Sequence, residues 1–262
     1  MNQIDNHQAR KRFGQNFLVD TQVVDNIIAA IRPAPGDNLV EIGPGQGAIT
    51  GPLLARGGRL HAVEVDRDLA ALLGRRFADN SGFVLHLGDA LAFDFSQLPQ
   101  PLRVVGNLPY NISTPLLFHL LNYASGIRDM HFMLQKEVVD RMAAAPGSKT
   151  YGRLSVIVQY YCEVCHLFNV PASAFRPVPK VESAIVRLIP RPDSEQRARD
   201  NRFFETLVKT AFQQRRKTLR NTLKQLPGDW DLNVLSIDLS LRPEVLTISQ
   251  FVTLSNELDQ QR

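Results

Sequence analysis

The sequence contains few cysteines and no long apolar run, and both absences restrict the class of protein. Cys162 and Cys165 are the only cysteines among 262 residues. Two cysteines cannot build a disulfide framework, so a small secreted scaffold is disfavoured. No apolar run is long enough to cross a bilayer, and no apolar stretch follows the basic residues near the N-terminus. We therefore expect a cytoplasmic protein that is not associated with a membrane.

Charge of either sign is also not in large excess. The chain has 30 Lys and Arg against 26 Asp and Glu, for a formal charge of +4. This balance permits nucleic-acid binding without requiring it, so the positions of the basic residues matter more than their number. Hydrophobic residues make up 44%, which is enough to bury a full core in one large domain or in a large and a small one.

Short apolar runs alternate with longer stretches through the first 190 residues. This alternation predicts βαβ units and a mostly parallel sheet of the Rossmann type, with helices on both faces and ligands at the carboxyl ends of the strands. Residues 154–161 fit either a further strand or a helix preceding one. The segments with strand character are 38–42, 60–65, 83–87, 102–106, 130–134 and 184–189.

A change of pattern near residue 190 predicts a domain boundary. Residues 190–195 are rich in proline and charge, as in a linker. After them the pattern is helical to the end of the chain. We therefore expect an α/β domain over residues 1–190 and a small all-helical domain over residues 191–262.

Three glycines and two carboxylates follow successive predicted strands. Gly43, Gly45 and Gly47 come after the first strand, where glycine allows a tight turn and a close approach of a ligand to the backbone. Glu64, near the end of the second strand, can accept hydrogen bonds from ribose hydroxyls. Asp89 ends the third strand and can accept from an adenine amino group. Together they predict a nucleoside pocket, although the glycines alone do not decide between NAD and S-adenosylmethionine.

The sequence Asn107-Leu108-Pro109-Tyr110 follows the fourth predicted strand. An adenine amino group is a poor nucleophile, because its lone pair is delocalised into the ring. The side-chain oxygen of Asn107 and the carbonyl of Leu108 can accept hydrogen bonds from that amino group and favour a pyramidal nitrogen. Pro109 fixes the turn, and Tyr110 offers a face on which the base can stack. The motif therefore favours methylation of adenine N6 with S-adenosylmethionine as donor.

These motifs resemble the KsgA/RsmA family of ribosomal RNA adenine dimethylases, which methylate two adjacent adenosines near the 3′ end of 16S ribosomal RNA. The resemblance extends over nearly the whole chain. This sequence differs from the family at Val178, where the family usually has proline, but it retains Lys180. The asparagine at position 107 is similar to that of the RNA enzymes, whereas related DNA adenine methyltransferases usually have aspartate there. The matching segments are 11–18, 41–47, 106–115, 131–137, 151–156, 173–181 and 214–218.

The resemblance implies roles for particular residues. It implies that Phe175 closes on the target adenine from the side opposite Tyr110. It also implies a role in small-subunit biogenesis, with a precursor of the small ribosomal subunit as partner. Neither DNA binding nor a metal is expected, and nothing in the sequence indicates an obligate oligomer, so we expect a monomer. Contacts with S-adenosylmethionine are implied for Gln15, Asn16, Leu18, Gly43, Gly45, Glu64, Asp89, Ala90 and Asn107.

A basic segment in the second predicted domain is a candidate RNA-binding surface. Residues 209–224 contain six basic residues and no acidic one. Helical spacing places Phe212, Leu219, Leu223 and Leu226 on one face. The neighbouring face would present charge to phosphates, which position an RNA without reading its sequence. The residues assigned to RNA binding are Arg215, Arg216, Lys217, Arg220 and Lys224.

Two other functions are consistent with parts of the sequence. An RNA-binding assembly factor could carry methylation as a secondary activity. An adenine-N6 methylase of 23S ribosomal RNA, of the antibiotic-resistance type, shares a similar catalytic loop but lacks the stretch 151–156. The Cys162-x-x-Cys165 pair has strand-like surroundings and no second pair of ligands, so we expect neither a zinc nor a redox site.

Overall fold

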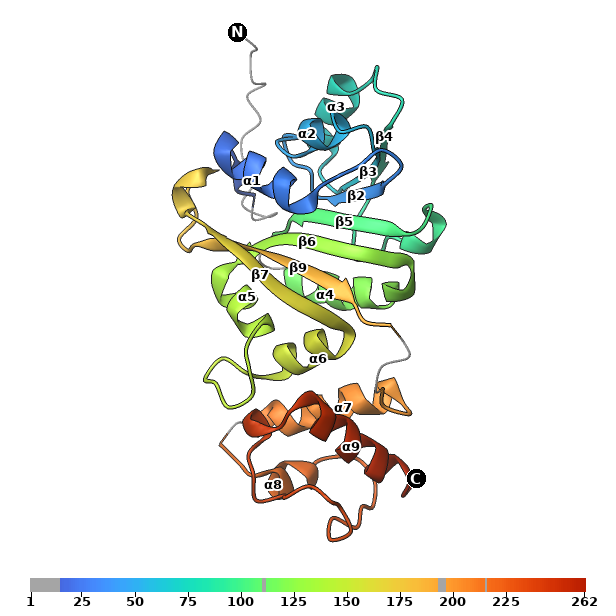
Figure 1. Cartoon of the computed structure of the whole chain (residues 1–262), viewed down its shortest axis with the longest axis vertical. Helices are drawn as coiled ribbons and strands as arrows, with labels where there is room; N and C mark the ends of the chain where they lie inside the picture. Colours follow the sequence, from blue (N-terminus) through green and yellow to red (C-terminus); the bar gives the residue numbers. More distant parts are fainter. Residues whose placement is uncertain (1–14, 110–111, 193–196, 215) are drawn as a thin grey trace. The chain divides into compact units, whose positions relative to one another are not determined.

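The computed structural model contains two compact units, of which residues 15–109, 112–192, 197–214 and 216–262 are described (Figure 1). The first unit comprises the described part of Met1–Val139 together with Cys165–Pro190. The second comprises Asp140–Val164 and the described part of Arg191–Arg262. The chain therefore passes between the units three times, once at residue 190. Residues 140–164 lie in the second unit, although their sequence pattern does not separate them from the first.

A seven-stranded mixed sheet has the strand order β4-β3-β2-β5-β6-β9-β7. The neighbours from β4 to β6 are parallel, and β9 runs antiparallel to β6. The expectation of a mostly parallel sheet is confirmed. The strands are β2 (Asn38–Ile42), β3 (Arg59–Glu64), β4 (Phe83–Leu87), β5 (Leu102–Asn107), β6 (Ile127–Gln135), β7 (Cys162–Val170) and β9 (Ser183–Pro190).

The strand order reverses between β2 and β5, since β3 and β4 follow on one side and β6 on the other. Such a switch point opens a crevice at the carboxyl ends of the strands, where open α/β sheets bind ligands. A separate two-stranded sheet pairs β1 (Phe17–Leu18) with β8 (Phe175–Arg176).

Helices flank the sheet (Figure 1). In α1, Asp20 caps the N-terminus by accepting from the Val23 N–H, and apolar residues from Val23 to Ile31 are buried at helical spacing. Residues 154–161 are helical and not a strand. None of the described helices has the length and apolarity needed to cross a membrane. The helices are α1 (Thr21–Ile31), α2 (Thr50–Leu54), α3 (Arg67–Arg76), α4 (Ser113–Leu121), α5 (Lys136–Met142), α6 (Arg153–Tyr161), α7 (Asn201–Ala211), α8 (Leu219–Leu223) and α9 (Ile248–Asp259).

The predicted helix over residues 209–224 is wrong in its continuity. It is divided between α7 and α8, with Thr218 in an extended conformation between them (φ −71°, ψ 160°). The N–H groups of Leu219 and Arg220 donate to the carbonyls of Leu241 and Leu239 instead of to a preceding helical turn. The expected C-terminal helical region is confirmed, and it includes a long loop, residues 224–247, whose one helical element is the 3₁₀ turn Pro243–Val245.

A buried ionic cluster lies beside the C-terminus of α1. Arg103 on β5 is 5% exposed, and its guanidinium donates to Asp37 at 2.7 Å and to Asp129 at 3.0 Å. It also donates to the carbonyls of Ile31 and Arg32, which the last turn of α1 leaves without helical partners. Arg103 therefore joins α1, β5 and β6 at the end of the sheet opposite the crevice.

Candidate active site

The turn after β2 requires glycine for conformational and steric reasons. Gly43, Gly45 and Gly47 all have positive φ, of 63°, 59° and 81°, a conformation that side chains with a Cβ rarely adopt. A Cβ at Gly45 would also lie 3.2 Å from the Phe17 ring. The turn thus keeps its main chain open to whatever binds at the strand ends.

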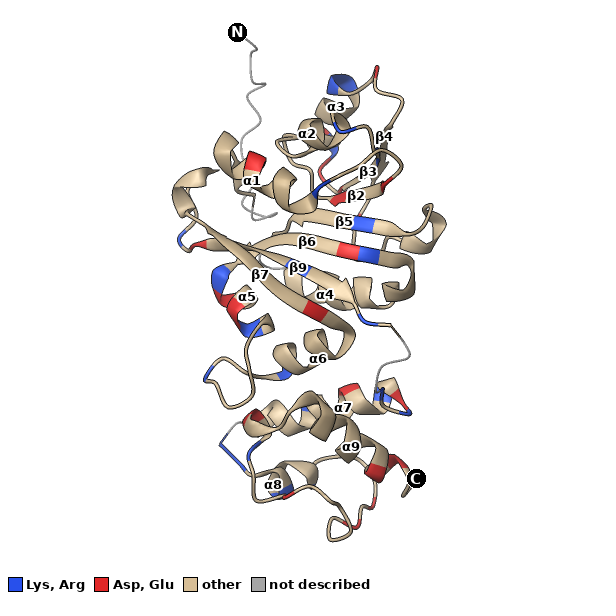
Figure 2. Ribbon diagram, viewed as in Figure 1, with Lys and Arg blue, Asp and Glu red and all other residues tan. Residues whose placement is uncertain are grey.

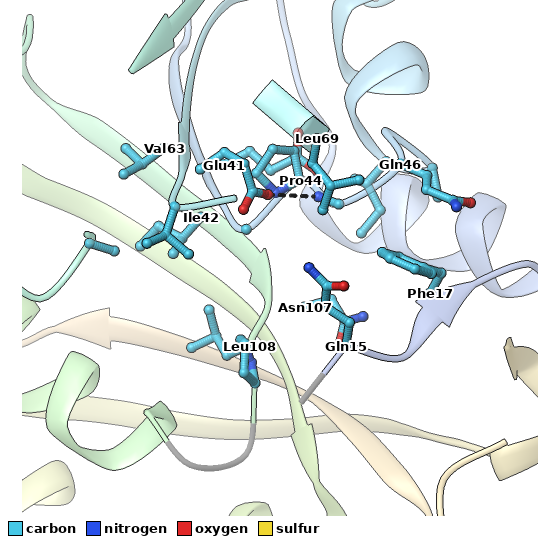
Figure 3. A pocket seen from close by; sticks show the side chains of 18 of the residues that line it. Gln15, Phe17, Glu41, Ile42, Pro44, Gln46, Val63, Leu69, Asn107 and Leu108 are labelled. Atoms are coloured by element: carbon cyan, nitrogen blue, oxygen red, sulfur yellow. Dashed lines mark hydrogen bonds between the residues drawn. The ribbon is translucent and has the colours of Figure 1, made fainter. Parts of the chain in front are cut away.

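A pocket lies at this turn and at the carboxyl ends of β2 to β5 (Figure 3). In the view of Figure 3, the side chains of Gln15, Phe17 and Asn107 gather on one side of it, below Pro44 and Gln46 of the turn. The pocket contains every residue that the sequence analysis assigned to the cofactor. These are Gln15, Asn16, Leu18, Gly43, Gly45, Glu64, Asp89, Ala90 and Asn107.

Two carboxylates are held in place around the pocket. Glu64 is 4% exposed, and its two oxygens accept from the N–H groups of Asp66 at 2.9 Å and Gly45 at 3.3 Å. Burial raises its pKa. Asp89 accepts from the Leu91 N–H at 2.9 Å. Each oxygen can accept a further hydrogen bond, so Glu64 and Asp89 suit the hydroxyl and amino groups of an adenosine.

The character of the lining distinguishes the two candidate nucleosides. Val65 and Leu69 give it apolar surface suited to a purine. Among the described residues that line the pocket, none is Lys or Arg. A dinucleotide brings a pyrophosphate, which usually needs such charges or a helix N-terminus. The residues present therefore fit S-adenosylmethionine, which carries no phosphate.

Asn107, at the end of β5, reaches the same pocket because of a glycine before it. A Cβ at Gly106 would lie 2.7 Å from the Ile42 carbonyl oxygen, so only glycine lets β5 approach β2 this closely. The Leu108 N–H donates to the Met133 carbonyl at 3.2 Å, and the Ile112 N–H donates to the Pro109 carbonyl at 3.2 Å. Asn107, Leu108 and Pro109 line the pocket together, whereas Tyr110 lies outside the described residues.

Phe175 lines the pocket but is deeply buried. It is 1% exposed and belongs to an apolar cluster with Val24, Ile27 and Ile185. The Phe175 ring therefore belongs to the hydrophobic core and forms part of the wall of the pocket that Asn107 also lines. Stacking on a target base stays a prediction for Phe175.

The residues assigned to RNA binding lie in the second unit. Arg216 and Lys217 precede α8, Arg220 lies on it and Lys224 follows it. All four are exposed. Figure 2 shows basic residues in blue at α8. Leu219, Leu223 and Leu226 are buried, as the helical spacing predicts. Arg215 lies outside the described residues.

Several lining residues were not assigned from the sequence, and Phe17 and Glu41 are the most informative of them. Phe17 belongs to β1, with its ring against Gly45 of the glycine turn, and only its position in the segment 11–18 could have indicated it. Glu41 lines the pocket and is only 2% exposed to solvent. Its carboxylate accepts a hydrogen bond from the Thr50 hydroxyl at 2.7 Å. Burial raises the pKa of Glu41 to about 7. Its place in an apolar strand could have revealed it as an unusual buried acid.

We predict that Glu41 makes stability fall as pH rises. The folded-state pKa of about 7 exceeds the ordinary value of 4.5, so the folded state binds the proton more tightly than the unfolded state does. The contribution of Glu41 to the free energy of unfolding is then largest below pH 4.5 and should decrease by about 1.4 kcal/mol per pH unit between pH 4.5 and pH 7. Glu41→Gln should lose this dependence and be more stable than the parent at pH 8. Urea unfolding of both proteins at pH 5 and pH 8 measures this. If the free energy of unfolding changed by the same amount between the two pH values in both proteins, the prediction would be contradicted.

The fold and the pocket together define a Rossmann-like methyltransferase that uses S-adenosylmethionine. The sequence matches the model of the family described as "Ribosomal RNA adenine dimethylase" over residues 6–260. The chain belongs to this family.

Relatives and solved structures agree with this assignment. The "Ribosomal RNA small subunit methyltransferase A" of Pseudomonas fluorescens (strain Pf0-1) is 58% identical, over 97% of this chain and 95% of that protein. The protein of the same name from Aromatoleum aromaticum is 56% identical, over 95% and 94%. The crystal structure of a dimethyladenosine transferase from Plasmodium falciparum has a TM-score of 0.81 at 28% identity and covers 94% of this chain and 98% of its own.

Proposed function

We propose that the chain transfers methyl groups from S-adenosylmethionine to N6 of two adjacent adenosines near the 3′ end of 16S ribosomal RNA. The observation that carries this proposal is that Asn107, the glycine turn and Glu64 line one pocket. Two methyl groups on each base make four transfers. The relatives' name supplies the small subunit as the substrate particle, and the adjacent pair of adenosines comes from the family resemblance.

The pocket residues would act mainly by positioning. The cofactor supplies an electrophilic methyl group when it is bound. The Asn107 side-chain oxygen and the Leu108 carbonyl would each accept a hydrogen bond from the amino group, which turns the nitrogen lone pair out of conjugation. Fixed dipoles in a pocket that excludes water lower the barrier without reorganising during the reaction. Once methylated, the nitrogen would carry a positive charge and an acidic N–H, which can lose its proton to water, so a strong general base is not required.

The direct test is transfer of radiolabelled methyl groups to undermethylated small subunits, followed by mapping of the product nucleotides. We expect label in two neighbouring adenosines of 16S ribosomal RNA, with two methyl groups on each. Label in 23S ribosomal RNA, or single methylation only, would contradict the proposal. Equilibrium dialysis against S-adenosylmethionine and NAD tests the cofactor separately.

We propose that the second unit binds the RNA backbone through Arg216, Lys217, Arg220 and Lys224. Binding to phosphates releases counterions, so affinity falls with salt concentration in proportion to the number of contacts. Arg216→Ala or Lys217→Ala should weaken small-subunit binding and reduce the slope of log K against log salt by about one. Filter binding between 50 and 200 mM salt measures both.

A matched control is Arg202→Ala, which removes an exposed arginine from the first turn of α7. This variant should keep the salt slope of the parent. If the Arg202 and Arg216 variants behave alike, the basic segment at α8 has no particular role.

We further propose that the chain acts as a cytoplasmic monomer and contributes to small-subunit biogenesis, where the particle it methylates is assembled.

A further inference from the structure

The side-chain amide of Asn107 has one partner among the described residues, and that partner is a main-chain carbonyl. Asn107 Nδ2 donates to the carbonyl oxygen of Asn16 at 3.2 Å. The two residues are 91 positions apart, so the contact exists only in the folded chain. Among the described residues, no group donates a hydrogen bond to Asn107 Oδ1, and Asn107 lines the pocket.

The Asn16 carbonyl is held in place from both sides. On one side the Gln15 side chain donates to Asp66 at 3.2 Å, and Asp66 is buried at the N-cap of α3. On the other side Phe17 and Leu18 form β1, which pairs with β8. The Val19 N–H continues this pairing by donating to the Ala174 carbonyl at 2.9 Å. A carbonyl anchored in this way cannot easily turn aside from whatever stands at residue 107.

This contact decides which side chains can work at residue 107. An amide presents a donor to Asn16 and keeps its oxygen for the pocket. An ionised carboxylate has only acceptors, so one of its oxygens would face the carbonyl oxygen at about the same distance, which is repulsive. A protonated carboxyl group restores the donor and leaves the other oxygen as an acceptor.

We propose that Asn16, through its main-chain carbonyl, is the positioning residue that turns the Asn107 amide oxygen toward the target amino group and so requires asparagine instead of aspartate there. This inference rests on the proposed function of Asn107. It adds a reason for the residue type that the motif alone does not supply. Asn16, the residue before β1, then has a role in catalysis, through Asn107, besides lining the pocket.

The test is the pH dependence of the variant Asn107→Asp relative to the parent. Methyl transfer to undermethylated small subunits is measured for both proteins between pH 5.5 and 8.5 at saturating substrates. Glu41, Glu64 and Asp89 are the titratable groups among the described lining residues, and no titratable residue of β1 faces Asn107. Since those groups are common to both proteins, their effects largely cancel in the ratio of the two kcat values.

We expect the ratio of the variant's kcat to the parent's to rise as pH falls, approaching tenfold per pH unit above the pKa of the new carboxyl group. Asn107→Ala is the baseline and should give a flat ratio. If Asn107→Asp is as active as the parent at pH 8, or its ratio is flat, the proposal is wrong. A parent without methyl transfer would instead contradict the proposed function.

A second measurement does not depend on folding of the Asp variant. An ester in place of the Asn16–Phe17 amide weakens the Asn16 carbonyl as an acceptor. It should lower kcat by roughly two- to tenfold, the range for losing one neutral hydrogen bond. An ester at Leu18–Val19 removes the N–H that donates to Ala174 but leaves the Asn16 carbonyl intact, and it should have a smaller effect. Equal effects of the two esters would overturn the assignment.

Discussion

Replacing Asn107 by alanine should lower kcat for methyl transfer by a factor of about 10² to 10³, the usual result of removing one preorganised polar group from an active site. The alanine has no oxygen to accept from the target amino group, so the nitrogen lone pair stays conjugated with the ring. The fold should tolerate the change, because within the described part of the chain the Asn107 side chain makes one hydrogen bond, to Asn16. Binding to small subunits should persist, since the proposed phosphate contacts lie in the second unit.

The matched control is Asn122→Ala, which removes an exposed asparagine at the C-cap of α4. It should methylate at the parent's rate. Single-turnover transfer and sedimentation with small subunits separate chemistry from binding. An unchanged rate in Asn107→Ala would refute the catalytic assignment. Loss of subunit binding in the same variant would show that the pocket also carries the interaction with the particle.

Replacing Arg103 by leucine should reduce the free energy of unfolding by about 3–5 kcal/mol, the range for removing one partner of a buried ion pair. Asp37 and Asp129 would lose the guanidinium that neutralises them. The two carbonyls at the end of α1 would lose their donor as well. Leucine fills part of the volume but cannot replace any of these hydrogen bonds.

Urea unfolding should be monitored by hydrogen exchange of the β5 amides, which report on this part of the molecule. Fluorescence of the single tryptophan, Trp230, would not report on it, because Trp230 lies in the second unit. Arg128→Ala is the matched control, because Arg128 also pairs with Asp37, at 3.3 Å, but is 60% exposed. An exposed pair contributes about 1 kcal/mol or less. Similar losses in both variants would show that burial of Arg103 has no special importance.

Local sequence patterns were sufficient where a structure depends on neighbours along the chain. The strands β2 to β6 follow from short apolar runs, and the glycine turn follows from the three glycines after the first of them. Leu219 and Leu223 are buried on one side of α8, as helical spacing predicts, and Leu226 is buried beyond the end of that helix. The predicted helix over 209–224 failed because the loop that supplies the Leu239 and Leu241 carbonyls lies about twenty residues away along the chain. A pattern of local spacing contains no information about such a partner.

By itself, the sequence determined the methyltransferase class and the family. It also predicted that the glycine turn, Glu64 and Asn107 meet in one pocket, because consecutive parallel strands bring their carboxyl ends to one edge. The tertiary structure alone decided how those residues are held. It placed the Asn16 carbonyl against the Asn107 amide, packed Phe175 into the core, buried Glu41 in the pocket wall and gathered α1, β5 and β6 around Arg103. Each of these depends on groups far apart in the chain, whose distances and solvent exposure are set only when the sheet and its flanking segments have packed.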